Sequence, residues 1–221
     1  MTDESLAPTK GTRAERVRRA SQERRTLQKE ELRRAILHVA GELFLKHGYE
    51  DFSLRQVAEF LGYSPTTIYL YFENKDALLF ELMDDAYRTF RDAETRAFSS
   101  TEDPIQRLVA IGRAYVDFGL THPTAYKLMF VQRVDYLMGC FDGETESRLA
   151  SVEASQYAVQ LAMEAGVIRQ GDPAVIFAVL WSTMHGLVML ALTMPKFDAI
   201  TTQRVRDASL KILLDGLTTL P

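Results

Sequence analysis

The chain has 221 residues and a hydrophobic fraction of 47%, which excludes wholesale disorder and allows one good core, or one small and one medium domain. Its one cysteine, Cys140, has no partner for an internal disulfide, so we expect a reducing, cytoplasmic environment. No apolar N-terminal stretch precedes a cleavage site, and no secretion signal is expected.

Charge is distributed unevenly along the chain. The formal net charge is −4, yet residues 1–35 carry ten Lys and Arg against six Asp and Glu, a balance of +4. Residues 36–221 carry sixteen against twenty-four, a balance of −8. A basic end can approach phosphates while an acidic body stays away from them, so the net charge does not exclude a nucleic-acid partner.

Residues 1–26 form a basic N-terminal segment with almost no large apolar side chains. Two interpretations stay open. The segment is either a solvated, flexible tail that becomes helical towards its end, or a basic arm that neutralises phosphates or enters the minor groove. An arm that becomes ordered only on DNA would satisfy both.

Residues 27–73 predict a small three-helix head. The first helix ends at Gly48, and the apolar stripe that buries it consists of Leu32, Ile36, Val39 and Leu43. The second helix begins at Ser53, which can form a capping box with Gln56. It ends at Gly62, a residue that tolerates the left-handed conformation.

A third helix follows almost at once. Ser64 can cap it, and Pro65 occupies its first position, where a missing N–H costs nothing. Two short helices joined by so tight a glycine-containing turn predict a helix-turn-helix.

The outer surface of this third helix determines the predicted function. Ile68 and Phe72 share one face and should pack inward. The other faces carry Thr66, Thr67, Tyr69, Leu70 and Tyr71. Hydroxyl groups of Thr and Tyr reach phosphate oxygens or base edges without long, flexible side chains. Asn74 can cap the next helix, whose first turn places Lys75 beside exposed N–H donors as a phosphate clamp. The alternative is a helical hairpin with an ordinary polar surface.

Residues 35–78 combine several motifs in one run. They include Phe44, Gly48-Tyr49, Phe52-Ser53-Leu54, Val57-Ala58, Gly62, Ser64, Thr67-Ile68-Tyr69, Tyr71-Phe72, Asn74-Lys75 and Leu78. This combination resembles the TetR family of bacterial transcriptional regulators. The resemblance implies that DNA is contacted by Ser53, Arg55, Ser64, Thr66, Thr67, Tyr69, Tyr71 and Lys75. Two positions depart from the family pattern, since Pro65 stands where many members carry a basic residue and Thr66 where many carry glycine.

Residues 74–221 predict a larger helical domain for effector binding and dimerisation. A long helix from Asn74 to about Ser99 should connect it to the head, as a signal between the two parts would require. Further helices begin near Pro104 and Pro123, an interruption falls at residues 139–143, and no alternating strand pattern appears. The predicted fold class is therefore all-α.

Residues 174–194 carry no formal charge apart from a possible one on His185. At about 1.5 Å per residue such a helix is long enough to cross a bilayer. Polar residues interrupt it and no basic cluster flanks it, so we expect no membrane span. A helix apolar on all sides is equally expected where a ligand-domain core meets a subunit interface.

The last helix is the expected partner of this apolar helix. Its residues at helical spacing are Val205, Ala208, Ile212 and Leu217. Two such helices from each of two chains would form a four-helix interface, and a homodimer is what a two-fold symmetric operator requires.

Aromatic and methionine side chains predict an adaptable apolar cavity in the second domain. The candidate ligand-binding residues are Phe90, Tyr115, Phe118, Tyr126, Met129, Phe130, Tyr157, Met163, Trp181, Met184 and His185. For any single one, a place in the core is the alternative. His185 is either a polar handle of the cavity or a hydrogen-bonded core histidine at the dimer contact. Residues 181–187 also resemble a motif of one TetR subgroup, whose ligand domain is named after Trp, His and Gly.

No catalytic arrangement is evident. The four histidines are scattered, Cys140 has no nearby histidine, and neither a P-loop nor a dinucleotide fingerprint is present. We therefore expect neither an enzyme nor a cofactor.

These patterns predict a homodimeric transcriptional regulator in a bacterial cytoplasm, associated with the nucleoid when bound to DNA. It is expected to repress from a palindromic operator and to be released by an apolar or aromatic small molecule. An activator and a regulator controlled by a protein partner are alternatives in the same class. From another class, the chain could be a small-molecule binding or sequestering protein with a vestigial DNA-binding head.

Overall fold

The computed structural model describes residues 12–131 and 145–218, and every extended regular element in them is a helix. In chain order the helices are α1 (Arg13–Asp51), α2 (Leu54–Leu61), α3 (Pro65–Tyr69), α4 (Lys75–Phe98), α5 (Pro104–Thr121), α6 (Pro123–Phe130), α8 (Thr145–Glu164), α9 (Pro173–Thr193) and α10 (Ala199–Leu217). No strand occurs in these two ranges, where Ile168 and Thr218 form an isolated bridge. The predicted all-α class is confirmed. The predicted interruption at residues 139–143, with Cys140, lies outside the described residues.

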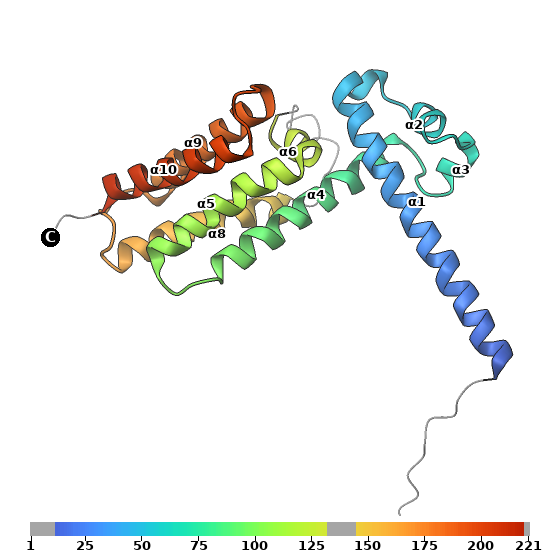
Figure 1. Cartoon of the computed structure of the whole chain (residues 1–221), viewed down its shortest axis with the longest axis horizontal. Coiled ribbons are helices and arrows are strands. Elements are labelled where there is room, and N and C mark those ends of the chain that lie inside the picture. The colour runs from blue at the N-terminus through green and yellow to red at the C-terminus, as the bar shows by residue number, and fades with distance from the viewer. Residues whose placement is uncertain (1–11, 132–144, 219–221) are drawn as a thin grey trace, which may run out of the picture.

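The helices form two parts that share α4 (Figure 1). The C-terminal half of α1 makes the head together with α2 and α3. The body consists of α5, α6, α8, α9 and α10. α4 packs against α1 at one end and runs along α5 at the other, so it connects the two parts as the sequence predicts.

Local hydrogen bonds delimit the helices of the head. Ser53 Oγ accepts a hydrogen bond from Gln56 N at 3.4 Å, and Gln56 Oε1 accepts one from Ser53 N at 2.8 Å, which closes the predicted capping box. Gly62 ends α2 in the left-handed region, with φ 71° and ψ 26°. Gly48, with φ 74°, interrupts the helical path inside α1 at the predicted end of the first helix.

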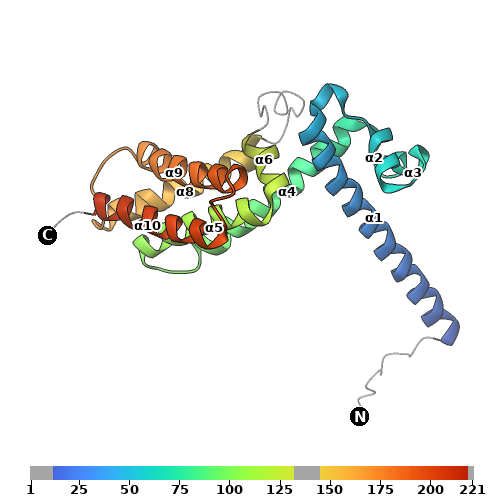
Figure 2. The same cartoon turned by 45° about the horizontal axis from the view of Figure 1, so that its top comes forward.

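α1 extends well beyond the head in the N-terminal direction (Figures 1 and 2). It begins at Arg13, where Thr12 and Glu15 form a capping box, and continues without interruption into the head. Residues 22–31 are exposed on every side of the helix. The described part of the predicted N-terminal segment is therefore helical, and no element boundary falls at residue 26.

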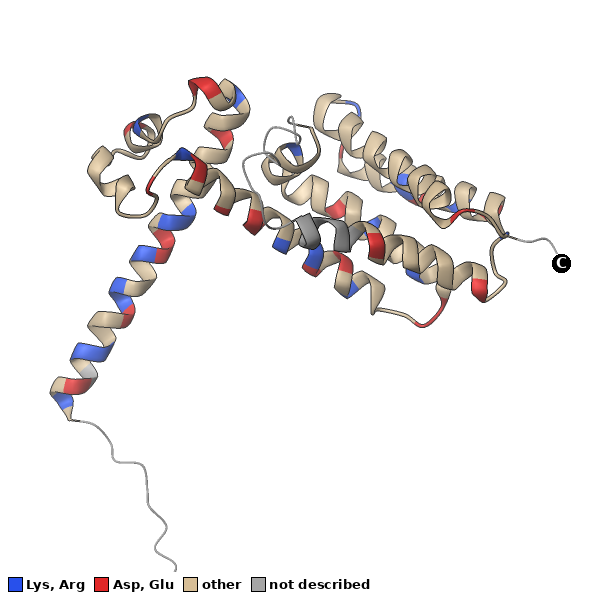
Figure 3. Cartoon of the chain, turned by 180° about the vertical axis from the view of Figure 1, so that it is seen from behind, with Lys and Arg blue, Asp and Glu red and all other residues tan. Residues whose placement is uncertain are grey.

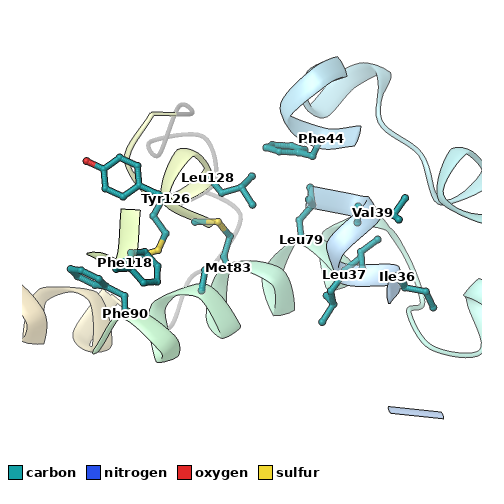
Figure 4. Packing of buried hydrophobic residues seen from close by; sticks show 14 of the residues in the cluster. Ile36, Leu37, Val39, Phe44, Leu79, Met83, Phe90, Phe118, Tyr126 and Leu128 are labelled. Carbon is teal, nitrogen blue, oxygen red and sulfur yellow. The ribbon is translucent and has the colours of Figure 1, made fainter. Parts of the chain in front are cut away.

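One hydrophobic core runs from the head into the body. Figure 4 shows Phe44 and Leu79 in the head part of this cluster and Phe90 in the body part. α6 packs against both α1 and α4. A Cβ atom on Gly41 of α1 would lie 2.9 Å from Thr124 Cγ2 of α6, so glycine permits the close approach of these helices. Head and body are thus connected through α6 as well as through α4.

α5 is the central helix of the body and approaches two neighbours closely at glycines. A Cβ atom on Gly112 would lie 2.7 Å from Leu210 Cδ2 of α10, and one on Gly119 would lie 2.5 Å from Val188 Cγ1 of α9. A second apolar cluster, formed largely by α8 and its neighbours, completes the body at the end far from the head.

α9 is the one helix in the described ranges that is long and apolar enough to cross a membrane. One side packs against α5, α8 and α10 and buries Leu187 and Val188. Val175 and Val179 remain exposed on another side. α9 is therefore packed as a helix of the body, with an apolar side that a single chain leaves uncovered.

Candidate nucleic-acid interface and effector cavity

A short capped helix forms the outer edge of the head. Ser64 Oγ accepts a hydrogen bond from Thr67 N at 3.2 Å and lies 2.9 Å from Thr67 Oγ1. α3 ends at Tyr69, two residues before Tyr71, which the sequence predicts on the same helix, and Tyr71 N donates to Ile68 O in the turn that follows. Ile68 and Phe72 are buried, as predicted, so the remaining side chains of this segment face outwards or sideways.

The residues predicted to contact DNA fall into two groups by exposure. Arg55, Ser64, Thr66 and Tyr69 are exposed, and Tyr69 keeps 51% of its surface accessible. Ser53, Thr67, Tyr71 and Lys75 are half-buried, since each also supports the head. The structure brings Ser64, Thr66, Thr67 and Tyr69 together on or beside α3. Leu70, which the sequence predicts on an outer face without assigning it a contact, is 77% exposed beside them.

Lys75 is held at the junction of α1 and α4. Its Nζ donates a hydrogen bond to the carbonyl oxygen of Tyr49 at 2.9 Å and lies 3.8 Å from the centre of the Tyr49 ring. The Tyr49 hydroxyl donates in turn to Asp76. An ammonium group has three protons, so Lys75 can keep the Tyr49 contact and still donate to a phosphate. The residue motif included Tyr49, but the sequence did not indicate this contact.

The body contains a cavity of about 350 Å³ that is partly open to the surface, between α4, α5, α6, α8, α9 and α10. Five of the predicted ligand-binding residues line it: Phe90, Tyr115, Phe130, Trp181 and Met184. The other lining residues include Glu94, Ile111, Gly112, Val159, Phe177 and Leu210, which were not predicted. The lining is apolar and aromatic apart from a few polar groups, as is usual for small-molecule sites.

A hydrogen-bonded network adjoins this cavity. Trp181 Nε1 donates to the Tyr115 hydroxyl at 3.0 Å, and that hydroxyl lies 3.1 Å from the Tyr126 hydroxyl. His185 Nδ1 lies 2.6 Å from the Tyr126 hydroxyl and 3.1 Å from the Tyr115 hydroxyl. The network joins α5, α6 and α9, so it connects the cavity wall to the helix that packs against the head.

Burial keeps this network uncharged. It raises the pKa of Tyr115 far above its usual range and raises the pKa of Tyr126 to about 12. Burial also lowers the pKa of His185, which favours the neutral imidazole. At neutral pH the network therefore carries no charge, and of its four side chains Tyr115 and Trp181 line the cavity.

The remaining predicted ligand-binding residues do not line the cavity. Phe118, Tyr126 and Met129 are buried core residues. His185 lies behind the wall and is bonded to Tyr115, and Met163 belongs to the second apolar cluster. Tyr157 is 50% exposed and stacks on Phe98. In the structure these six side chains therefore lie in the core or at the surface and not in the cavity wall.

No group of three or more His, Cys, Asp and Glu that could hold a metal ion occurs in residues 12–131 and 145–218. The described histidines are scattered as well, with His38 and His47 on α1, His122 between α5 and α6 and His185 on α9. The two candidate sites are thus a polar outer helix and an apolar internal cavity.

Comparison with known protein families separates the same two parts. Residues 36–82 match the family described as bacterial regulatory proteins, tetR family. Residues 108–217 match the tetracyclin repressor-like C-terminal domain. The chain belongs to the TetR family. The membership covers both the head and the body, whereas the resemblance in the sequence rests on residues 35–78 of the head and the short run 181–187 of the body.

Individual TetR regulators resemble the chain over different lengths. The HTH-type transcriptional regulator Rv1816 of Mycobacterium tuberculosis is 30% identical over 104 residues, which are 46% of this chain and 44% of that protein. The chain therefore aligns with less than half of that relative.

Solved TetR-like structures agree in fold over almost the whole described chain. The ketosteroid transcriptional regulator KstR2 of Mycobacterium tuberculosis has a TM-score of 0.73 at 19% identity, with 85% of this chain and 95% of that chain covered. AibR, solved in complex with isovaleryl coenzyme A and operator DNA, has a TM-score of 0.68 at 21% identity, with 82% and 97% covered. At such identities the likeness concerns the fold alone.

Proposed function

We propose that the protein is a ligand-responsive transcriptional regulator that represses from a palindromic operator as a homodimer. It acts in a bacterial cytoplasm, at the nucleoid when bound to DNA, and is released by an apolar or aromatic small molecule. The observation that carries the proposal is α3, whose buried Ile68 leaves the hydroxyl-bearing Thr66 and Tyr69 exposed at the edge of a TetR head.

In this proposal α3 enters the major groove, and the head comprises residues 27–73. Thr66 and Thr67 lie near base edges, while Ser64, Tyr69 and Tyr71 donate to phosphates. Arg55 of α2 and Lys75 of α4 flank α3 and contact the phosphate backbone on either side, with Ser53 at the start of α2. The hydrogen bonds that fix Ser64 and Thr67 reduce the entropy lost on binding.

The homodimer would form through the exposed apolar side of α9 and α10. On α9 this side carries Val175, Val179, Gly186 and Leu190, and on α10 it carries Val205, Ala208, Ile212 and Gly216. Ile212 is 71% exposed, and a Cβ atom on Gly186 or Gly216 would meet nothing within 4 Å inside the chain. Small and apolar residues along two antiparallel helices suit a four-helix contact between two chains.

The cavity is proposed to hold the effector within residues 74–221. Its volume of about 350 Å³ lies at the lower end of the range for small-molecule sites. Phe90, Trp181 and Met184 offer apolar contacts there, and Tyr115 offers a hydroxyl. The AibR structure holds both a small molecule and operator DNA, so this fold accommodates the two ligands together.

Coupling would follow the hydrogen-bonded network from the cavity to the head. A ligand that displaces Trp181 or Tyr115 moves the partners of Tyr126 on α6, and α6 packs against α1 at Gly41. An effector that prefers the non-binding arrangement by about 1.4 kcal/mol shifts the equilibrium tenfold. By linkage, DNA must weaken effector binding by the same factor.

Two linked experiments test the proposal. Genomic DNA fragments bound by the purified protein are selected and sequenced, and a palindromic consensus is the expected result. Apolar and aromatic compounds are then screened by thermal shift, and those that stabilise the protein are tested for release of the selected fragment. If no fragment were bound with sequence preference, the proposed role as a transcriptional regulator would be contradicted. Stabilisation without release would contradict the coupling.

The second candidate function is a binding or sequestering protein with a vestigial head. The cavity favours it, since a ligand cavity serves storage as well as signalling. The selection experiment separates the two, because a sequestering protein would bind the effector without any preference for a DNA sequence.

A further inference from the structure

The N-terminal half of α1 carries a basic stripe, defined by Arg18, Gln22, Arg25 and Lys29. We propose that this stripe binds the phosphate backbone of the DNA duplex beside the segment that α3 contacts. The inference rests on the proposed DNA-binding function and adds to it a second contact surface on each chain.

Helical spacing places the side chains of the basic stripe on one side of α1. At about 100° per residue, Arg18 and Lys29 point within roughly 40° of Arg25. Leu32, seven residues after Arg25, points the same way and packs against the core of the head, as does the buried Ile36. The stripe therefore continues the core-facing side of α1 beyond the head, on the side where α2 and α3 lie.

Acidic residues are absent from this direction. The four glutamates between residues 13 and 34 are Glu15, Glu23, Glu30 and Glu31, and each points roughly 80° or more away from Arg25. Figure 3 shows Lys and Arg alternating with Asp and Glu along this part of α1. Glu23 pairs with Arg19, which lies off the stripe. Within the described ranges, Arg18, Arg25 and Lys29 are in no side-chain hydrogen bond or ion pair.

An open groove lies between the basic stripe and the residues that flank α3. Its volume is about 960 Å³, and Arg25 and Lys29 line one side while Tyr63 and Tyr71 line the other. Glu31 is the one acidic residue that lines it. Gln28 adds an amide to the lining. Cations, amides and phenolic hydroxyls are groups that contact the sugar–phosphate backbone in protein–DNA complexes. The groove thus presents suitable donors next to the turn that ends α3.

The dimensions and the charge favour duplex DNA as the occupant. From Arg18 to Lys29 the stripe spans about 17 Å along the helix axis, and a duplex carries one negative charge per ~1.7 Å. A second copy of the same basic stripe would be repelled. The duplex that α3 enters is already adjacent, so contact with the stripe requires no second ligand.

A charge-matched pair of variants tests the stripe in the full-length protein. In the first, Arg18, Arg25 and Lys29 are replaced by Gln, and in the control Arg13, Arg19 and Arg34 are replaced by Gln. Both lose three charges, and Gln retains a good helix propensity. The control residues point roughly 120° or more away from Arg25. The probe is a labelled mixed-sequence duplex of about 40 base pairs, bound at a series of salt concentrations, with helicity checked by circular dichroism.

The expected result is a loss of salt dependence confined to the first variant. Three phosphate contacts correspond to a slope of log K against log salt that is less steep by about 2.7 per chain. Equal slopes for the two variants would contradict phosphate binding by the basic stripe, because the loss would then follow from the change in net charge alone. A first variant that becomes monomeric in sedimentation would show that a second copy covers the stripe instead. Wild-type protein without duplex binding at any salt concentration would overturn the proposed function, and with it this inference.

Discussion

The head and the body obtain their candidate sites in different ways. In the head, three side chains cap three helices within a few residues of themselves: Ser53 with Gln56, Ser64 with Thr67 and Asn74 with Ala77. In the body, the cavity wall joins residues as distant in sequence as Phe90 and Leu210. A DNA-contacting surface can therefore be built from local bonds, whereas an internal cavity depends on how several helices pack.

Because of this difference, substitutions in the head and in the body should affect different properties of the protein. The candidate contacts of the head are exposed or half-buried and none is fully buried, so substitutions there should alter DNA affinity more than folding. In the body, Phe90, Tyr115 and Met184 are buried and Tyr115 is hydrogen-bonded, so substitutions at these positions should alter folding first. Each prediction below changes one region and measures both properties.

The largest effect is expected at the proposed dimer contact, on which both regions depend. Replacing Val205 and Ile212 by Glu puts charges on the exposed apolar side of α10 and should yield monomers. Because two heads no longer bind one duplex together, affinity for the operator should fall by about 10²-fold or more. Sedimentation and fluorescence anisotropy measure the two effects.

A control for this variant is available on the same helix. Gln203→Glu together with Lys211→Gln changes the net charge by the same amount at exposed positions away from the apolar side of α10. The control should remain dimeric and bind DNA normally. Tight operator binding by a monomeric Val205→Glu, Ile212→Glu protein would contradict the symmetric arrangement.

The next effect is expected in the body alone. Tyr115→Phe removes the hydroxyl that accepts from Trp181 Nε1 and lies near Tyr126 and His185. Unpaired buried groups cost about 1–3 kcal/mol, so thermal or urea denaturation should show a loss of that size. Tyr157→Phe, on an exposed ring, should change stability by less than about 0.5 kcal/mol. A Tyr115→Phe protein as stable as wild type would show that the network does not support the body.

The sequence predicts most of the head because its signals are local. Ser53, Gly62, Ser64, Pro65 and Asn74 are all capping or terminating residues, and each occupies that position in the structure. The exception is the length of α3, which ends at Tyr69. Leu70 N still donates to the carbonyls of residues 66 and 67, but Tyr71 N bonds back to residue 68 and starts a turn that spacing alone does not reveal.

The cavity could be predicted only in part, because apolar periodicity does not distinguish a core side chain from a cavity wall. Phe118 and Phe90 look alike in sequence, yet Phe90 lines the cavity and Phe118 does not. Helical spacing would have found some missed residues. Glu94 follows Phe90 by four residues, and Phe177 precedes Trp181 by four, so both share a side with a predicted residue.

A smaller effect is expected in the head alone. Thr67→Ala removes the methyl and hydroxyl groups beside Ser64. The hydrogen bond that the backbone N–H of Thr67 donates to Ser64 Oγ remains. Affinity for the selected operator should fall about tenfold, with a change in the preferred bases. The free energy of unfolding should hardly change. Thr95→Ala, an exposed position on α4, should leave affinity unchanged. Equal losses on specific and random duplexes would assign Thr67 to phosphates instead of bases.

The smallest effect is a pH dependence of stability that originates in the body. Burial lowers the pKa of His185, so below its ordinary value of about 6.5 the unfolded chain binds a proton more readily than the folded chain. The contribution of His185 is therefore complete above that pH and is lost as the pH falls through the lowered pKa. Between pH 7.5 and about 5.5 the Tm of wild type should decrease more than that of His185→Gln. Identical pH profiles would contradict this assignment, whereas a difference that disappears in Tyr115→Phe would place its origin in the hydrogen-bonded network beside the cavity.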